Sequence, residues 1–149
     1  MIRKYQDKNI EELLEVWFWS SSLAHPFLSD DFMKKERENI RNKWIPRSET
    51  WVYELEGVVI GFISLIGIEV GAIFVAPNRY GQGFGRALMD HAKSIHNTLE
   101  VEVFKENTIG RKFYDRQGFI VIKELIHEET GNQLIRMRWH WESITSVSR

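Results

Sequence analysis

The chain contains no cysteine among its 149 residues, which excludes disulfides, thiolate metal sites and a cysteine nucleophile. Its formal net charge is only −1, so no excess of positive charge favours nucleic acid as a partner. No apolar run is long enough to cross a membrane, and no apolar segment of the secretory type follows Met1 to Lys4. We therefore expect a cytoplasmic protein with no metal site that binds neither nucleic acid nor membrane.

Proline is also scarce, with three residues, and no stretch rich in proline, glycine and serine divides the chain. The composition is 43% hydrophobic and 28% charged, which is typical of a globular domain with a substantial core. The length is that of one domain. We expect a single domain over residues 1–142 and a C-terminal tail over residues 143–149.

The most informative stretch runs from Ala72 to Asp90 and reads AIFVAPNRYGQGFGRALMD. An apolar β-prone run ends at Pro77, and glycines follow at positions 81, 83 and 85. Apolar residues with helical spacing then begin at Phe84. A strand, a glycine loop and a helix in this order leave backbone N–H groups free at a positively polarised helix start, which favours an anion such as phosphate.

Two common phosphate motifs do not fit this loop. Arg86 and Ala87 follow the last glycine, whereas a P-loop requires Lys and then Ser or Thr. The alternate glycines also lack the spacing of the dinucleotide fingerprint. A plain glycine linker is the simpler alternative, but a linker does not require a helix start directly after it.

The segment resembles the acetyl-CoA motif of the GCN5-related N-acetyltransferases, the GNAT superfamily. That motif reads Arg/Gln-x-x-Gly-x-Gly/Ala and corresponds here to residues 80–85, YGQGFG. The first position departs from the pattern because it is Tyr80, with Arg79 before it. The resemblance implies a backbone seat for the diphosphate of the coenzyme, and leaves open whether Arg79 or Tyr80 contacts it.

A second motif of the same superfamily, N…FY…GF, is similar to Asn107 followed by Phe113-Tyr114 and Gly118-Phe119. Together the two motifs imply acetyl-CoA as the cofactor. The residues that the resemblance places against it are Phe74, Val75, Gln82, Gly83, Phe84, Gly85, Arg86, Asn107 and Tyr114.

The periodicity of the whole chain predicts the order β-α-α-β-β-β-α-β-α-β-β, which matches the GNAT fold. We expect an α/β (α+β) domain with a mixed, mostly antiparallel sheet of six or seven strands flanked by four helices. The first helix is predicted from an N-cap at Asp7 to about Ser20, and the second from Ser29-Asp30-Asp31 to about Asn42, with Trp44 to Pro46 leading out of it. The last strand is predicted over residues 134–141.

Acetyl transfer to an amine needs a deprotonated amine, a donor for the developing oxyanion and a proton for the leaving thiolate. Tyr114 is our candidate for the proton donor, because a phenol stays protonated at neutral pH. The N–H of Val75 is the candidate oxyanion donor. Two bases are considered: Glu69, expected on the same strand face as Val75 because it lies six residues earlier, and His25, with an ordinary pKa near 6.5.

The predicted acceptor is a primary amine of a small molecule or peptide. Candidate pocket residues are aromatic and include Trp17, His25, Phe27 and Trp44, which slightly favours an acceptor with an apolar body. A non-catalytic module that only binds an acyl-CoA is the main alternative. A weaker one is a subunit interaction domain with Trp139 and Trp141 on an edge strand, and a homodimer is one option for this chain.

Overall fold

The computed structural model describes residues 1–142, so the predicted tail at 143–149 lies outside the described residues. The strands are β1 (Ile2–Lys4), β2 (Glu49–Leu55), β3 (Val58–Ile66), β4 (Glu69–Val75), β5 (Thr98–Phe104), β6 (Ile120–Ile126) and β7 (Gln133–His140). The helices are α1 (Ile10–Ala24), α2 (Asp30–Asn39), α3 (Ile45–Arg47), α4 (Phe84–Ile95) and α5 (Thr108–Arg116).

All seven strands form one mixed sheet in the order β1-β2-β3-β4-β5-β7-β6. Neighbouring strands are antiparallel except β4 and β5, which are parallel and are connected through α4. A parallel pair needs such a crossover, because a short turn cannot bring the chain back to the same end of the sheet. The predicted fold class and the order of its main elements are confirmed.

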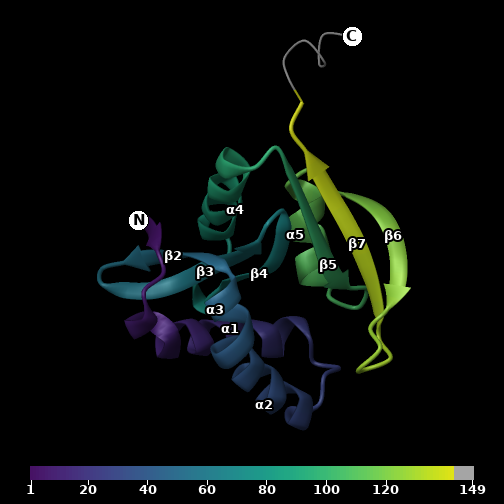
Figure 1. Ribbon diagram of the computed structural model, residues 1–149, viewed down its shortest axis with the longest axis horizontal. Coiled ribbons are helices and arrows are strands. Elements are labelled where there is room, and N and C mark those ends of the chain that lie inside the picture. The colour runs from purple at the N-terminus through teal and green to yellow at the C-terminus, as the bar shows by residue number, and fades with distance from the viewer. Residues whose placement is uncertain (143–149) are drawn as a thin grey trace.

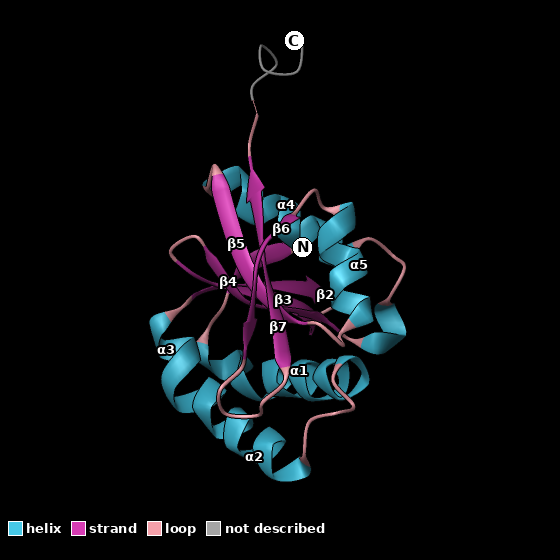
Figure 2. Cartoon of the chain, turned by 90° about the vertical axis from the view of Figure 1, so that its right-hand side faces the viewer, coloured by secondary structure: helices cyan, strands magenta, loops and turns pink. Residues whose placement is uncertain are grey.

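Two hydrophobic cores lie on opposite faces of the sheet. Helices α4 and α5 cover one face, where Leu88 and Met89 pack against buried side chains of β3, β4, β5 and β7. Helices α1 and α2 cover the other face, where Leu13 and Leu14 pack against β2 and β3. Figures 1 and 2 show α1 and α2 beneath the β2–β4 half, so part of the β5–β7–β6 half is open on their side.

Several local features follow directly from the residues that form them. Strand β3 is buried from Val59 to Leu65, as its continuous apolar run indicates. The β2–β3 turn has positive φ at both Glu56 and Gly57, which is the conformation that tight hairpins require. Helix α5 begins after Asn107, whose side chain accepts from the Gly110 N–H at 2.8 Å, and it ends before Gly118 at φ +89°.

The first helix is longer than predicted. Its serines do not break it, and α1 continues to Ala24, where Pro26 prevents further helix. Ser20 and Ser21 are both buried, with side chains that form hydrogen bonds inside the protein. Asp7 is also not the N-cap, because it opens a short 3₁₀ turn (Asp7–Asn9), after which Asn9 precedes α1.

The second helix also continues beyond its predicted end near Asn42. A π-helical turn (Ile40–Trp44) follows α2 and leads directly into α3, so Trp44 to Pro46 extend the helical path. Proline is compatible here because it lies in the first turn of α3, where a backbone N–H has no helical partner.

The expectation that Trp139 and Trp141 lie on an edge strand is wrong. Strand β7, which carries Trp139, lies between β5 and β6, and β6 forms the edge. Trp139 packs against the α4–α5 core, and the Nζ of Lys93 lies 4.9 Å from its ring centroid. Trp141 follows the end of β7 and is exposed.

Residues 1–142 lack two further kinds of feature. None of the helices described there combines the length and apolar character needed to cross a bilayer. Within the same residues, no three histidine, aspartate or glutamate side chains are grouped so that they could hold a metal ion.

Phe119 and Ile120 offer a matched test of the α4–α5 core, since Phe119 is 1% exposed and its neighbour Ile120 is 66% exposed. We expect Phe119→Ala to lower the free energy of unfolding by about 3–5 kcal/mol, because it leaves a cavity. We expect Ile120→Ala to change it by about 0.5 kcal/mol or less. Urea denaturation of both variants measures the difference, and similar losses would contradict this assignment of the core.

Candidate active site

The centre of the sheet contains a wedge between the two parallel strands. Among the described residues, β4 and β5 share a single register pair, Glu69 with Glu100, supported by a bond from the Glu100 N–H to the Ile68 carbonyl at 2.9 Å. Beyond this pair the strands run on without further pairing, to Val75 in β4 and to Phe104 in β5. The part of β4 nearest the glycine loop therefore has one edge without a strand partner.

The hydrogen-bond alternation of β4 identifies which backbone groups face this wedge. The Ala76 N–H donates to the Ile60 carbonyl at 2.8 Å, so the groups of Ala76 and Phe74 point toward β3. The groups of Val75 and Ile73 consequently point the other way, toward β5. This alternation favours the backbone of Val75 as a partner for the coenzyme, whereas the amide of Phe74 points to β3. It also identifies the backbone of Ile73 as a second group that faces the wedge, which the sequence reasoning missed.

The glycine loop has the open backbone that a diphosphate requires. Gly81 and Gly83 have φ of +78° and +87°, and a Cβ built on either would meet no atom within 4 Å. Gly83 is the N-cap of α4, and no side chain caps the helix there. The first-turn N–H groups of α4 thus lack a side-chain acceptor, and this donor set fits the diphosphate of coenzyme A.

The side chains around the loop differ in their orientation. Phe84 packs edge-on against Tyr53 at 4.7 Å between ring centroids, so its backbone N–H is the part available to a ligand. Arg86 is exposed and lies 3.8 Å from Asp90, and Gln82 makes a 3.5 Å contact with the Asn78 carbonyl. Gly85 allows close packing of α4 on α5, because a Cβ there would lie 3.2 Å from the Phe113 ring.

Asn107 and His25 form one hydrogen-bonded unit. Because the Asn107 Oδ1 accepts from Gly110, its Nδ2 is the donor to His25 Nε2 at 3.1 Å. This leaves His25 Nδ1 as the protonated nitrogen, 2.9 Å from the Ser21 hydroxyl. Burial lowers the pKa of His25 to about 4. Both nitrogens are engaged and the ring is neutral at pH 7, so the geometry does not support His25 as a base.

Helix α1 contacts both sides of the wedge through consecutive serines that the sequence reasoning missed. The Ser20 hydroxyl donates to the Val75 carbonyl at 2.5 Å, on β4. Ser21 bonds His25, which in turn accepts from Asn107 at the start of α5. The Ser20-Ser21-Ser22 run interrupts the apolar stripe of this helix. That interruption is the feature of the sequence from which buried polar contacts of α1 could have been predicted.

Tyr114 lies in the same core as Val75, on the face covered by α4 and α5. Its ring packs edge-on against Phe113 and Phe119, each at 5.5 Å between centroids. Burial raises the pKa of Tyr114, so the phenol remains protonated through the neutral range. A neutral phenol beside the wedge can donate a proton, as the predicted role requires.

Glu69 does not share a strand face with Val75, which corrects the sequence expectation. The register of β3 and β4 moves from Ser64–Ala72 to Leu65–Val70, so Gly71 is an extra residue in β4. Such a bulge reverses the alternation of side chains beyond it. The carboxylate of Glu69 instead binds the guanidinium of Arg136, with Oε1 to Nη2 at 2.6 Å and Oε2 to Nη1 at 3.3 Å.

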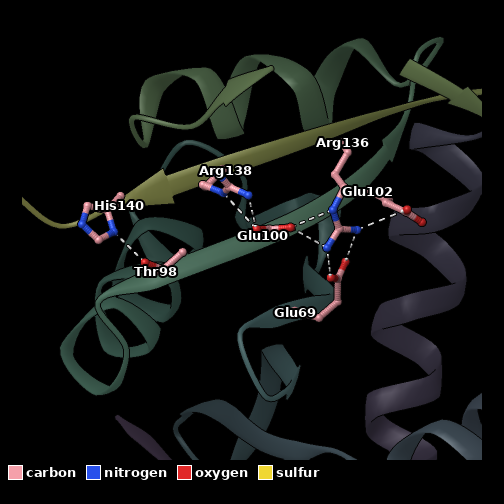
Figure 3. Close-up of polar contacts among 7 residues, drawn as sticks. All are labelled: Glu69, Thr98, Glu100, Glu102, Arg136, Arg138 and His140. Atoms are coloured by element: carbon pink, nitrogen blue, oxygen red, sulfur yellow. Dashed lines mark hydrogen bonds and ion pairs between the residues drawn. The ribbon is translucent and has the colours of Figure 1, made fainter. Parts of the chain in front are cut away.

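Figure 3 shows the polar cluster that surrounds this pair on the sheet face opposite α4 and α5. Glu100 bonds Arg136 through one oxygen at 2.7 Å and Arg138 through the other at 2.9 Å, and these contacts lower its pKa. Glu102 makes a single contact, from Oε2 to Arg136 Nη1 at 3.2 Å, and its side chain is 38% exposed. Glu102 is therefore the least engaged carboxylate of the cluster.

A hollow of about 390 Å³ lies between the α1–α2 loop with the start of α2 and the β6–β7 turn. Phe27 lines it as expected of an acceptor pocket, whereas Trp17 is buried in the α1–α2 core and does not. Trp44 is outside the lining as well and is 38% exposed. The full lining combines apolar and charged side chains: Phe27, Leu28, Ser29, Asp31, Phe32, Lys35, Glu129, Thr130 and Asn132.

Comparison with known proteins gives relatives along almost the whole chain. Peptidyl-lysine N-acetyltransferase YiaC of Escherichia coli is 31% identical over 140 residues, which are 93% of this chain and 96% of the relative. Peptidyl-lysine N-acetyltransferase YjaB of the same organism is 33% identical over 121 residues, covering 80% and 82% of the two chains.

Solved structures have the same fold. The solution structure of apo YjaB from Escherichia coli has a TM-score of 0.85 at 28% identity and covers 95% of this chain and 98% of that one. The PaiA N-acetyltransferase of Thermoplasma acidophilum, in complex with coenzyme A, has a TM-score of 0.78 at 19% identity over 95% and 98%. Residues 46–121 match the family model described as acetyltransferase (GNAT) domain. The chain therefore belongs to the GNAT family and is an acetyl-CoA-dependent N-acetyltransferase.

Proposed function

We propose that the acceptor of this enzyme is the side-chain amine of lysine in a peptide or protein. The observation that carries the proposal is the similarity to YiaC and YjaB, which are both named peptidyl-lysine N-acetyltransferases and align with most of this chain. An acceptor on a macromolecule needs an approach that is open to solvent. The hollow between the α1–α2 loop and the β6–β7 turn is of this kind. Its lining includes the carboxylate of Asp31, whereas that of Glu129 is paired with Lys35 at 3.4 Å.

The site also argues against a module that only binds an acyl-CoA. Such a module would need the diphosphate seat but no proton donor. Tyr114 is instead a buried phenol whose raised pKa keeps it protonated. The enzyme activity of the family and this donor together favour catalysis over simple binding.

In the proposed mechanism acetyl-CoA supplies the acetyl thioester, and the chain supplies three groups. The N–H groups around Gly83 and Gly85 hold the diphosphate. The Val75 N–H, which points into the wedge, donates to the carbonyl oxygen on which negative charge develops. The Tyr114 hydroxyl gives its proton to the departing thiolate.

We propose Glu102 as the group that takes the proton from the acceptor amine, directly or through a water. The two candidates from sequence are engaged elsewhere, Glu69 by both oxygens with Arg136 and His25 by both nitrogens. Glu102 has the fewest contacts of the clustered carboxylates and is exposed on the side of the sheet opposite α4 and α5. A lysine amine has an ordinary pKa near 10.4, so some group must accept its proton before attack.

The location and assembly of the enzyme also remain proposals. We propose that it acts in the cytoplasm, in line with the absence of cysteine from the chain.

Homodimerisation stays a prediction. A second copy would pair with the sheet edge at β6, which exposes three apolar side chains, Ile120, Val121 and Ile126.

The acceptor is tested with acetyl-CoA and a panel of peptides that each carry one free amine. One set has a free lysine side chain and a blocked N-terminus, and the matched set has a blocked lysine and a free N-terminus. We expect mass spectrometry to show acetylation in the first set. Turnover confined to the second set, or to small amines added as a third group, would contradict the proposal.

Tyr114→Phe tests the proton donor. We expect kcat to fall about 100-fold, because the leaving thiolate loses its proton source, while the KM for acetyl-CoA changes little. Tyr5→Phe makes the same chemical change in the core covered by α1 and α2. It should leave kcat and the KM for acetyl-CoA near those of the parent enzyme. Unchanged kcat in Tyr114→Phe would remove this residue from the mechanism.

Glu102→Gln and Glu69→Gln, compared by the pH dependence of kcat/KM, test the base. We expect Glu102→Gln to lower kcat/KM about 100-fold and to abolish the fall in rate at acidic pH. Glu69→Gln should keep that fall at the same pH even where the rate is lower. His25, whose pKa is about 4, would titrate below the neutral range. A fall that disappears with Glu69→Gln and stays with Glu102→Gln would reverse the assignment.

A further inference from the structure

The sheet consists of two halves with very little backbone contact between them. Strands β1 to β4 form one half by continuous antiparallel pairing, and β5, β7 and β6 form the other. In the described chain, the pair Glu69–Glu100 and the Glu100 N–H bond to Ile68 connect them along the strands. On the face covered by α4 and α5, one hydrophobic core spans both halves. On the opposite face, the angle between the halves depends on side chains that cross from one half to the other.

Arg136 lies where it can fix that angle. It belongs to β7, directly opposite Glu102 of β5, yet its guanidinium extends past β5 to Glu69 of β4. Figure 3 shows the guanidinium between the three carboxylates, with Glu69 on one side and the strand that carries Glu100 and Glu102 on the other. One side chain thus connects both halves of the sheet at the closed end of the wedge.

The contacts engage all three nitrogens of the guanidinium. Nε bonds Glu100 at 2.7 Å, and Nη1 bonds Glu69 at 3.3 Å and Glu102 at 3.2 Å. Nη2 lies 2.6 Å from both Glu69 and Glu100. Four of these contacts are hydrogen bonds and the approach of Nη2 to Glu100 is an ion pair. Together they raise the pKa of Arg136, chiefly through Glu69. A lysine has no planar fork and could not hold three carboxylates in one orientation.

We infer that Arg136 is a positioning residue that sets the angle between β4 and β5, and so the fit of the pantetheine arm of acetyl-CoA in the wedge. The inference concerns the acetyl-CoA site alone and does not depend on the identity of the acceptor. Val75 lies on β4, and Tyr114 follows β5 on α5, so a change in this angle moves the two groups relative to each other.

Arg138 provides a matched control on the same strand. It bonds Glu100 through Nε at 2.9 Å and Nη2 at 2.8 Å, and neither contact reaches β4. Its side chain is 48% exposed, against 25% for Arg136. Removing Arg138 therefore takes a comparable charge from the cluster but leaves the connection between the halves intact.

The test measures binding by isothermal titration calorimetry with two probes, acetyl-CoA and 3′-phosphoadenosine 5′-diphosphate, which lacks the pantetheine arm. We expect Arg136→Gln and Arg136→Lys to weaken acetyl-CoA binding about tenfold and to leave the nucleotide within about twofold. Arg138→Gln should leave both probes within about twofold. An equal loss for the two probes, or an equal loss in Arg136→Gln and Arg138→Gln, would overturn the inference.

A double-mutant cycle identifies Glu69 as the other end of the connection. We expect Glu69→Gln to weaken acetyl-CoA binding to a similar extent as Arg136→Gln, and the double variant to show no further loss, because either change breaks the same contact. Independent, additive losses would contradict the connection. Circular dichroism and thermal unfolding of each variant confirm that the comparison is made between folded proteins.

Discussion

The separation of β4 from β5 is the constraint on which the rest of this structure depends. Buried strand groups are normally paired, and an unpaired N–H or C=O costs free energy unless water or a ligand bonds it. Within residues 1–142, the inner edge of β4 has no strand partner beyond Glu69–Glu100, and Ser20 satisfies one of its carbonyls, that of Val75. The remaining edge groups are suited to an extended molecule with amides of its own, which is the shape of a pantetheine arm.

Keeping this separation requires contacts at both ends of the wedge. At the closed end Arg136 connects β7 and β5 to β4 through Glu69. At the other end α1 contacts Val75 through Ser20 and Asn107 through His25. The two hydrophobic cores fill the space above and below the sheet. The wedge is thus an opening between strands that are connected at both of its ends and packed on both faces of the sheet.

The features that the sequence predicted correctly depend on neighbours in the chain. The glycine loop and the helix that starts at Phe84 directly after it follow from a few consecutive residues. The errors come from contacts between distant segments. The bulge at Gly71 is visible only in the register with β3, and it moves Glu69 to the other face. The place of β7 inside the sheet, and therefore of Trp139, likewise follows from pairing with β5 and β6.

The chemistry of the buried polar groups argues against His25 as the base. His25 has the residue type that suits proton transfer near neutral pH, but its site lowers its pKa to about 4 and engages both ring nitrogens. A histidine in this state orients hydrogen bonds, here by accepting from Asn107. Both carboxylate oxygens of Glu69 accept hydrogen bonds from Arg136, which makes Glu69 a less favourable candidate. A proton acceptor needs a free lone pair, and of the carboxylates in this cluster Glu102 has the fewest hydrogen bonds among the described residues, which is why we propose it as the base.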